Sequence, residues 1–290
     1  MKTIIEWDKP ALLQSPLFSP LNIIIEQLGV DHFPNLQDCN VLLEGRLPGV
    51  TTQSGQMVRF VDQTPGRLEF KSQYEPRGYL KGEIQTRSNN WHDLFNAMVW
   101  LAFSKAKSVI NARHYHALVE STIGVNELVS QNELKSNAIA SQRGPVRDTL
   151  TLLDESGVII PYSDTDLADL LRGFQWKKLF WEHREEAKSK IGFYIFGHGL
   201  YEKALRPYIG ITGQGILLPV DHAFFGWPLA ERIIYLDQRL ADYIDNPMHC
   251  RNTRELFPVP LLGVPGWTPP NEYAEFYDNK KYFRCGRRRT

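Results

Sequence analysis

A helical pattern over residues 91–119 constrains the fold of this chain more than any other segment. Its first three turns are apolar nearly all round, so we expect this helix to be buried. His92 and Asn96 nevertheless lie on its interior stripe, at about 100° per residue. A buried polar group costs free energy unless it is paired or used. These two side chains therefore either bond to backbone groups in the core or belong to a functional site.

Length and composition indicate one large domain. The chain has 290 residues, and a single core stops growing at about 250–300 residues. Hydrophobic residues make up 42% of the chain and aromatic residues 12%, which is enough for a packed core. We therefore expect residues 1–290 to form a single domain that ends in a basic tail at 286–290.

Charge and cysteine usage argue against several classes of protein. Lys plus Arg (33) equals Asp plus Glu (33), whereas nucleic-acid-binding proteins usually carry a basic excess. We therefore expect no nucleic-acid partner, while a small-molecule ligand and any oligomeric state stay open. Three widely spaced cysteines without a CxxC pair predict neither a disulfide framework nor a cysteine zinc site.

The N-terminal sequence and the apolar runs bear on location. The start, MKTIIEWDKPALL, lacks the apolar core of about 7–15 residues that a secretory signal needs. No run approaches the roughly 18–20 apolar residues of a membrane span. We therefore expect a cytoplasmic protein with no membrane segment.

The remaining patterns predict a mostly helical α+β fold. Strands are expected as short local hairpins over 57–72, with a turn at 64–67, and over 150–160, with a turn at 154–157. Clear βαβ alternation is absent, which favours α+β over a doubly wound sheet. The Pro-rich last 35 residues are expected to wrap over the core. Further helices are predicted at 20–29, 125–140, from 163 past 181, at 198–206 and from 228, and further strands at 192–197 and 211–220.

Polar residues around the start of the 91–119 helix are the first candidates for a site. Asn90 fits a helix N-cap and Asp93 an acid near the positive end of the helix, and Asp93 is also a candidate catalytic group. Arg87 just before the helix either forms a surface ion pair or binds an anion. His114 falls on the same face as His92 but about 33 Å further along a straight helix, so we expect the two not to share a site unless the helix breaks near residue 104.

A second candidate is the segment FGHGLYEKAL, where His198 follows a strand at a probable helix start. Glu202 lies four residues on, and such a pair can ligate a divalent metal. Asp154 and Glu155, by contrast, are expected in a hairpin turn, where adjacent side chains point to opposite faces and form a poor acid/base pair. Sequence fingerprints for nucleotide binding and for common hydrolases are absent.

Four segments carry a resemblance to a known family. They are TRSNNWHDLFNAMVWLAFSKAKSVINARH, LTLLDESGVII, FYIFGHGLYEKALRPYIGITG and PVPLLGVPGWTPPNEYAEFYD. In this order they resemble the bacterial family called domain of unknown function 3025, over about residues 20–285. The resemblance implies a single cytosolic domain but no activity, cofactor or catalytic residues. The candidate polar residues inside these segments are Arg87, Asn90, His92, Asp93, Asn96, His198, Glu202, Asn271 and Asp278.

Two functions follow as hypotheses. The first is a cytosolic enzyme, with hydrolysis as the reaction to test first because no cofactor fingerprint is visible. His92 or His198 would act as acid or base, Asp93 would assist, Arg87 would hold an anionic group, and Asn96 and Asn271 would orient the substrate. The alternative is a non-catalytic binding or scaffold protein that uses the aromatic C-terminal residues Trp267, Tyr273, Phe276 and Tyr277 as a partner surface.

Overall fold

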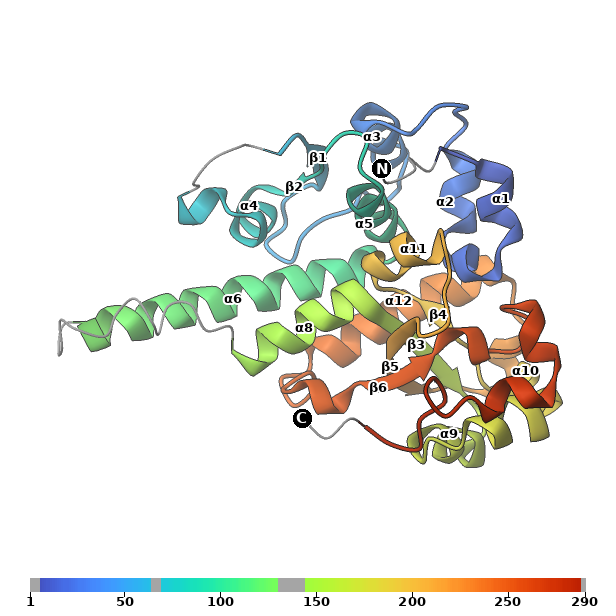
Figure 1. The fold of residues 1–290 in the computed structure, drawn as a ribbon. Coiled ribbons are helices and arrows are strands. Elements are labelled where there is room, and N and C mark those ends of the chain that lie inside the picture. Colours follow the sequence, from blue (N-terminus) through green and yellow to red (C-terminus); the bar gives the residue numbers. More distant parts are fainter. Residues whose placement is uncertain (1–5, 64–68, 130–143, 288–290) are drawn as a thin grey trace.

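The computed structural model describes residues 6–63, 69–129 and 144–287 and has an α+β architecture in which helices predominate (Figure 1). The larger sheet has the strand order β4–β3–β5–β6. Its two central strands, β3 (Gly157–Tyr162) and β5 (Thr212–Pro219), are parallel, and the outer strands β4 (Tyr194–Ile195) and β6 (Phe257–Pro260) are antiparallel to them. The predicted fold class is confirmed, but its strands pair across long stretches of chain.

The predicted hairpin over residues 57–72 is wrong. Strand β1 (Arg59–Val61) pairs in parallel with β2 (Glu83–Gln85), which follows the helix α4 (Tyr74–Lys81). The segment Phe70–Ser72 is a 3₁₀ turn, and the predicted turn at 64–67 lies outside the described residues. Alternation of Val58 and Phe60 correctly indicates a strand, but local alternation does not identify the partner.

The predicted hairpin over residues 150–160 is also wrong, and this error matters for the site. Residues Pro145–Ser156 form helix α8, which Pro145 starts at its first position and which buries Leu150 and Leu153 at helical spacing. The chain passes directly from α8 into β3 at Gly157. A Cβ at this position would lie 2.4 Å from the carbonyl oxygen of Leu153, so only glycine fits there.

The 91–119 helix breaks at Phe103. It divides into α5 (Trp91–Ala102) and α6 (Ser104–Val129), and Phe103 itself has non-helical φ and ψ of −127° and 52°. The first backbone N–H groups of α6 donate to the carboxylate of Asp237, on α12 (Leu229–Asp245), at 3.1 Å for Lys105 and 2.9 Å for Ala106. A side chain from another helix thus caps the new helix start. The predicted helix at 125–140 merges with α6 up to residue 129, and its remainder lies outside the described residues.

Of the other predicted elements, some are confirmed and some have different bounds or types. The helix α11 (His198–Ala204), the strand β5 and the helix α12 confirm three predictions. The helix expected from 163 past 181 is instead divided into α9 (Thr165–Arg172), a π-helical turn (Lys178–Glu182) and α10 (Arg184–Lys190). Helix α9 ends because Gly173 follows it and Phe174 takes a left-handed φ of 56°. The helix expected at 20–29 is a 3₁₀ turn (Pro16–Leu21) followed by α2 (Asn22–Gln27). The N-terminal part also holds α1 (Lys9–Gln14) and α3 (Leu36–Glu44), and the C-terminal part consists mainly of short 3₁₀ turns.

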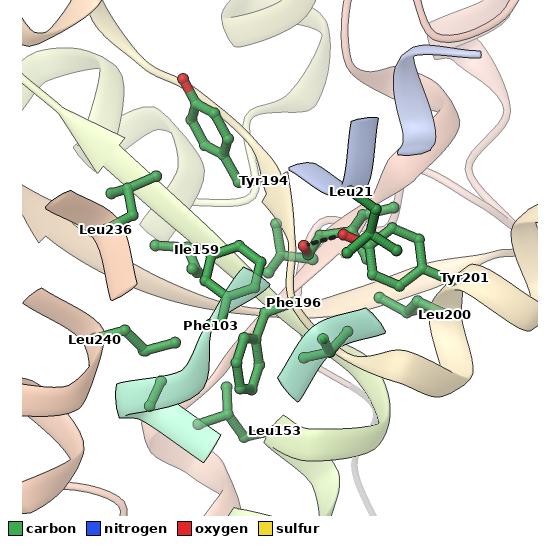
Figure 2. Packing of buried hydrophobic residues seen from close by; sticks show 14 of the residues in the cluster. Leu21, Phe103, Leu153, Ile159, Tyr194, Phe196, Leu200, Tyr201, Leu236 and Leu240 are labelled. Carbon is green, nitrogen blue, oxygen red and sulfur yellow. Dashed lines mark hydrogen bonds between the residues drawn. The ribbon is translucent and has the colours of Figure 1, made fainter. Parts of the chain in front are cut away.

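The core lies between the larger sheet and the helices that surround it. Figure 2 shows Phe103, at the helix break, among Ile159 of β3, Phe196 and the α12 residues Leu236 and Leu240. The hydroxyl of Tyr201 donates to the carbonyl oxygen of Ile195 at 2.6 Å, which ties α11 to the end of β4. This packing brings the starts of α5 and α11 close to the end of α8. Within the described residues, no helix has the length and apolar character to cross a membrane.

The buried cap of α6 gives a prediction about pH. Burial raises the pKa of Asp237 from 3.8 to about 6, although the backbone N–H groups of Ala106 and Lys105 oppose this shift. The raised pKa means that Asp237 favours folding fully below about pH 3.8, and that this contribution is lost as the pH rises through about 6. The stability of the wild type relative to Asp237→Asn should therefore fall by about 1–3 kcal/mol between pH 4 and pH 7.

Urea unfolding at several pH values measures this difference. Asp242→Asn, on the exposed face of the same helix, is the matched control and should show no such slope. Equal slopes for the two variants would contradict the burial argument.

Candidate functional site

Three helix ends converge on one polar cavity. His92 lies in the first turn of α5, His198 is the first residue of α11, and Asp154 and Glu155 lie in the last turn of α8. All four line a cavity of about 460 Å³, together with residues of α4 and α6. The core packing beneath them holds α5, α8 and α11 together at this point.

Two histidines and a glutamate form a small triangle in this cavity. The Nε2 atoms of His92 and His198 are 3.1 Å apart, and each lies 3.6 Å from Oε1 of Glu155. Among the described residues this is the one group of three that could hold a metal ion. Ligand atoms at about 2.0–2.1 Å from a tetrahedral Zn²⁺ are about 3.3–3.4 Å from one another. The spacing therefore fits three ligands of a single ion.

The outer nitrogens of both imidazoles face carboxylates. Nδ1 of His92 lies 3.3 Å from Oε2 of Glu202, and Nδ1 of His198 lies 3.6 Å from Oδ2 of Asp154. Metal-binding histidines commonly present their second ring nitrogen to a carboxylate, which fixes the tautomer and the ring orientation. The two histidines thus have the surroundings of metal ligands on both sides of the ring.

A buried ion pair anchors Asp154. The ammonium group of Lys107, on α6, donates to Oδ1 of Asp154 and, at 2.8 Å, to Oδ1 of Asn96 on α5. The Lys107 side chain is only 3% exposed. Asn96 in turn donates to the hydroxyl of Tyr74 on α4 at 2.7 Å. Four helices are thereby linked by one polar chain behind the triangle.

Burial sets the protonation states in the site. It lowers the pKa of His198 to about 4; Asp154 opposes this shift, whereas Lys107 and His92 add to it. His198 is therefore neutral near pH 7, which is the form that binds a metal. Burial also raises the pKa of Glu155, against the attraction of His92. Burial resists ionisation of Asp154, but Lys107 and His198 outweigh it and lower the pKa of that carboxyl.

Arg87 is held at the cavity by Asp93. Its Nε and Nη2 donate to the two carboxylate oxygens of Asp93, both at 2.8 Å, and its backbone N–H donates to the same group at 2.7 Å. Asn90 accepts from the backbone N–H of Asp93 at 3.0 Å, as an N-cap does. The carboxylate of Asp93 is thus engaged with Arg87, and the half-exposed guanidinium is fixed in one orientation.

The structure brings most of the predicted site residues together. His92, His198, Asp93, Arg87 and Asn96 all line the cavity. Glu202 reaches the site through His92, whose Nδ1 lies 3.3 Å from its Oε2, and not through the predicted pairing with His198.

Asn271 lies elsewhere, in the C-terminal segment. It is fully buried, and its amide donates to the carbonyl oxygens of Leu262 at 2.9 Å and Val264 at 2.7 Å. It does not line this cavity, and its bonds give it a structural role in the C-terminal turns.

Sequence reasoning missed Asp154, Glu155, Lys107 and His114. The sequence Asp-Glu-Ser-Gly predicts a hairpin turn for the two acids, whereas the helical spacing of Leu150 and Leu153 after Pro145 is the signal that points to a helix. The expectation that His114 lies apart from His92 is corrected, because both line the cavity. The helix breaks at Phe103, next to the expected position 104, so the separation along a straight helix does not apply.

The buried ion pair leads to a stability prediction. Lys107→Met should lower the free energy of unfolding by about 3–5 kcal/mol, because it leaves the charge of Asp154 buried without its partner. Lys105→Met is the matched control, since Lys105 is exposed on the same helix and donates to Gln238, and should change stability by less than about 0.5 kcal/mol. Urea unfolding at pH 7 measures both, and a Lys107 variant as stable as the wild type would contradict the pairing.

Comparison with known proteins places the chain in a family. The model of the family described as Protein of unknown function (DUF3025) matches residues 58–287. No curated protein and no solved structure gives a significant match. The matched region contains the triangle of His92, Glu155 and His198, and the groups behind it. Since the match covers well over half of its length, the chain belongs to the DUF3025 family.

Proposed function

We propose that this protein is a metal-dependent hydrolase whose divalent ion binds His92, His198 and Glu155. The observation that carries the proposal is the triangle of ligand atoms, with sides of 3.1, 3.6 and 3.6 Å. Two imidazoles and one carboxylate form the donor set of many catalytic zinc sites, which leave a fourth position for water or substrate. Zinc is therefore the first metal to test, ahead of metals that prefer oxygen ligands alone.

Hydrolysis suits this kind of site. A bound zinc ion lowers the pKa of water and polarises a carbonyl or phosphoryl oxygen. The reaction adds water across one bond: the water oxygen joins the carbon or phosphorus atom, and the leaving group takes the bonding electrons and a proton. No redox partner is required. The Arg87 guanidinium, fixed by Asp93, is placed to bind a negative charge on the substrate or on the reacting group.

The polar chain behind the triangle has a positioning role. Asn96 accepts from Lys107 and donates to Tyr74, so its amide serves to orient these two groups. Lys107 fixes Asp154, which faces Nδ1 of His198. Glu202 faces Nδ1 of His92 in the same way. These groups would hold both imidazoles in the orientation that a metal needs.

A metal-free acid/base pair is the second reading of the same geometry. The two Nε2 atoms at 3.1 Å are within hydrogen-bond distance and could share a proton. The low pKa of His198, about 4, disfavours it as a proton donor near pH 7.

The scaffold hypothesis finds less support in the structure. Of the four aromatic residues it requires, Tyr277 is fully buried, and Trp267 and Phe276 pack partly buried against the core. Tyr273 is largely exposed. One exposed ring is a small basis for a partner surface.

We further propose that the enzyme works in the bacterial cytoplasm. The cysteines Cys39, Cys250 and Cys285 are free thiols, and the first two are buried. Unpaired thiols suit a reducing compartment. Resemblance to a family of cytosolic bacterial proteins points the same way.

Zinc titration of the chelator-treated full-length chain tests the metal site. Isothermal calorimetry should give one ion per chain for the wild type. His198→Ala and Glu155→Gln should each weaken binding by about 100-fold or more, and Glu202→Gln by about 10-fold or more, because Glu202 orients His92. His32→Ala, which removes an exposed histidine that does not line the cavity, is the control and should bind zinc like the wild type. Equal affinity for all of these variants would contradict the assigned ligands.

Turnover measurements separate the metal-dependent mechanism from the metal-free one. A panel of ester, amide and phosphoester substrates should reveal an activity that chelator removes and zinc restores. His92→Ala should reduce that activity by about 1000-fold or more. Activity that resists chelator but is lost in His92→Ala would favour the acid/base pair. Activity that survives both treatments would remove this cavity from consideration as the active site.

A further inference from the structure

A second cavity, of about 500 Å³, shares no lining residue with the cavity that holds the triangle. Its floor belongs to β5 and β6, which lie side by side in the larger sheet (Figure 1). There Thr212 and Gln214 of β5 pair with Pro260 and Pro258 of β6. Alternate residues of a strand point to the same face, so these four side chains form one surface. The volume is in the range of small-molecule sites.

The charged residues in the wall of this cavity are all cations. They are Lys281, Arg284 and Arg287, and no Asp or Glu of the described residues lines the cavity with them. Arg284 donates through Nε to the neutral carbonyl oxygen of Lys281 at 3.1 Å. Within the part of the chain that the structure describes, none of the three cations forms an ion pair with a carboxylate. A cavity lined by charge of one sign concentrates ions of the opposite sign.

Arg287 is held in place by neutral groups. Its Nη2 donates to the carbonyl oxygens of Arg254 at 2.6 Å and of Leu256 at 2.9 Å, and its guanidinium lies 5.8 Å from the centre of the Phe257 ring. These contacts orient the guanidinium but give it no counter-charge. Burial lowers the pKa of Arg287, and the charge of Arg254 adds to this effect. An anion in the cavity would oppose both effects.

Two aromatic side chains form another wall of the cavity. Phe174 and Trp176 pack edge to face, with ring centroids 5.8 Å apart and ring planes at 85°. The Nε1 of Trp176 donates to the backbone carbonyl oxygen of Arg284 at 2.8 Å. This bond joins the aromatic wall to the segment that carries the cations.

Phe174 takes a backbone conformation that a bulky side chain disfavours. Its φ is 56°, and the N–H of the next residue, Gln175, donates to the carbonyl oxygen of Leu170 at 2.8 Å, as in a Schellman helix ending. Glycine is the usual residue at this position, and a side chain there costs free energy. An outlier of this kind beside a cavity leads to a hypothesis of function. Unlike glycine, Phe174 gives the cavity a flat apolar surface.

The floor adds polar groups to this apolar surface. The amide of Gln214 is half-buried and has no hydrogen-bond partner among the described residues, so it can both donate and accept. The hydroxyl of Thr212 donates to the carbonyl oxygen of Gly210 at 3.0 Å, which leaves its oxygen able to accept. A ligand ring with polar edges would find partners here.

From this combination we infer that the second cavity binds a nucleoside monophosphate. The cations would hold the phosphate, since Arg and Lys are the usual phosphate-binding side chains. The flat base would stack on Phe174, and its polar edge would reach Gln214. Side chains, not a glycine-rich loop, supply these contacts, so the sequence needs no nucleotide-binding fingerprint. The inference goes beyond the proposed function and does not depend on it, because the two cavities share no residue.

Calorimetry on the full-length chain, with and without zinc, provides the test. The probes are AMP, GMP, CMP and UMP, the four nucleosides that lack the phosphate, ribose 5-phosphate, which lacks the base, and hexyl phosphate, which has an apolar tail in place of the base. We expect at least one nucleotide to bind about tenfold or more tightly than its nucleoside, ribose 5-phosphate and hexyl phosphate. This affinity should be the same with and without zinc.

Variants locate the bound nucleotide. Lys281→Gln and Arg284→Gln should each weaken binding by about tenfold. Phe174→Gly should weaken it by about fivefold or more through loss of stacking, and glycine fits the left-handed φ. The matched control is Lys280→Gln, which removes an exposed neighbouring cation that does not line the cavity and should bind like the wild type. All four variants should keep the wild-type affinity for zinc.

Several results would overturn the inference. Hexyl phosphate or the nucleosides might match the nucleotides in affinity, which would remove the need for a phosphate and a base together. Nucleotide binding that requires zinc, or that Arg87→Gln abolishes and Lys281→Gln leaves intact, would put the ligand in the first cavity. Equal affinity for Lys281→Gln and Lys280→Gln would show that the cavity is not the site, even if Phe174→Gly does not fold. Zinc binding is measured separately, so the metal site stands or fails by itself.

Discussion

The buried ion pair between Lys107 and Asp154 is the interaction on which the site depends. It joins α6 to the last turn of α8, and through Asn96 it also reaches α5. Neither charge is tolerable in this interior without the other. The pair places Asp154 beside Nδ1 of His198, while Glu155, the next residue, lies beside Nε2 of the same ring. The two contacts of Lys107 thus set the relative position of α5 and α8, which hold the proposed ligands His92 and Glu155.

The break at Phe103 is the second constraint. An unbroken helix over 91–119 would carry His114 far from His92, whereas the break lets the two segments form different walls of one cavity. Phe103 occupies the core at the bend, and Asp237 satisfies the backbone N–H groups that the bend exposes. The price of interrupting the helix is thus offset by apolar packing on one side and by a cap on the other.

These two constraints show why the sequence predicts only part of the site. His92, Asn96 and Arg87 were recognised because polar residues in or next to an apolar helical pattern are visible locally. His198 was recognised from a strand, a glycine and a helix start. Asp154 and Glu155 were missed because the letters Asp-Glu-Ser-Gly suit a turn, and their helical state is decided by Leu150 and Leu153 packing in the core. Lys107 is explained only by its partner, 47 residues away.

The three proposed ligands come from three different helices, which meet only in the folded chain. The unfolded chain therefore offers no comparable site, and any ion bound to the triangle favours the folded state by mass action. Two imidazoles that contact each other at 3.1 Å, one with its Nδ1 buried 3.6 Å from a carboxylate, form an incomplete hydrogen-bond arrangement by themselves. A cation between them would complete it, because both Nε2 atoms would then serve as acceptors and both Nδ1 atoms as donors to Glu202 and Asp154.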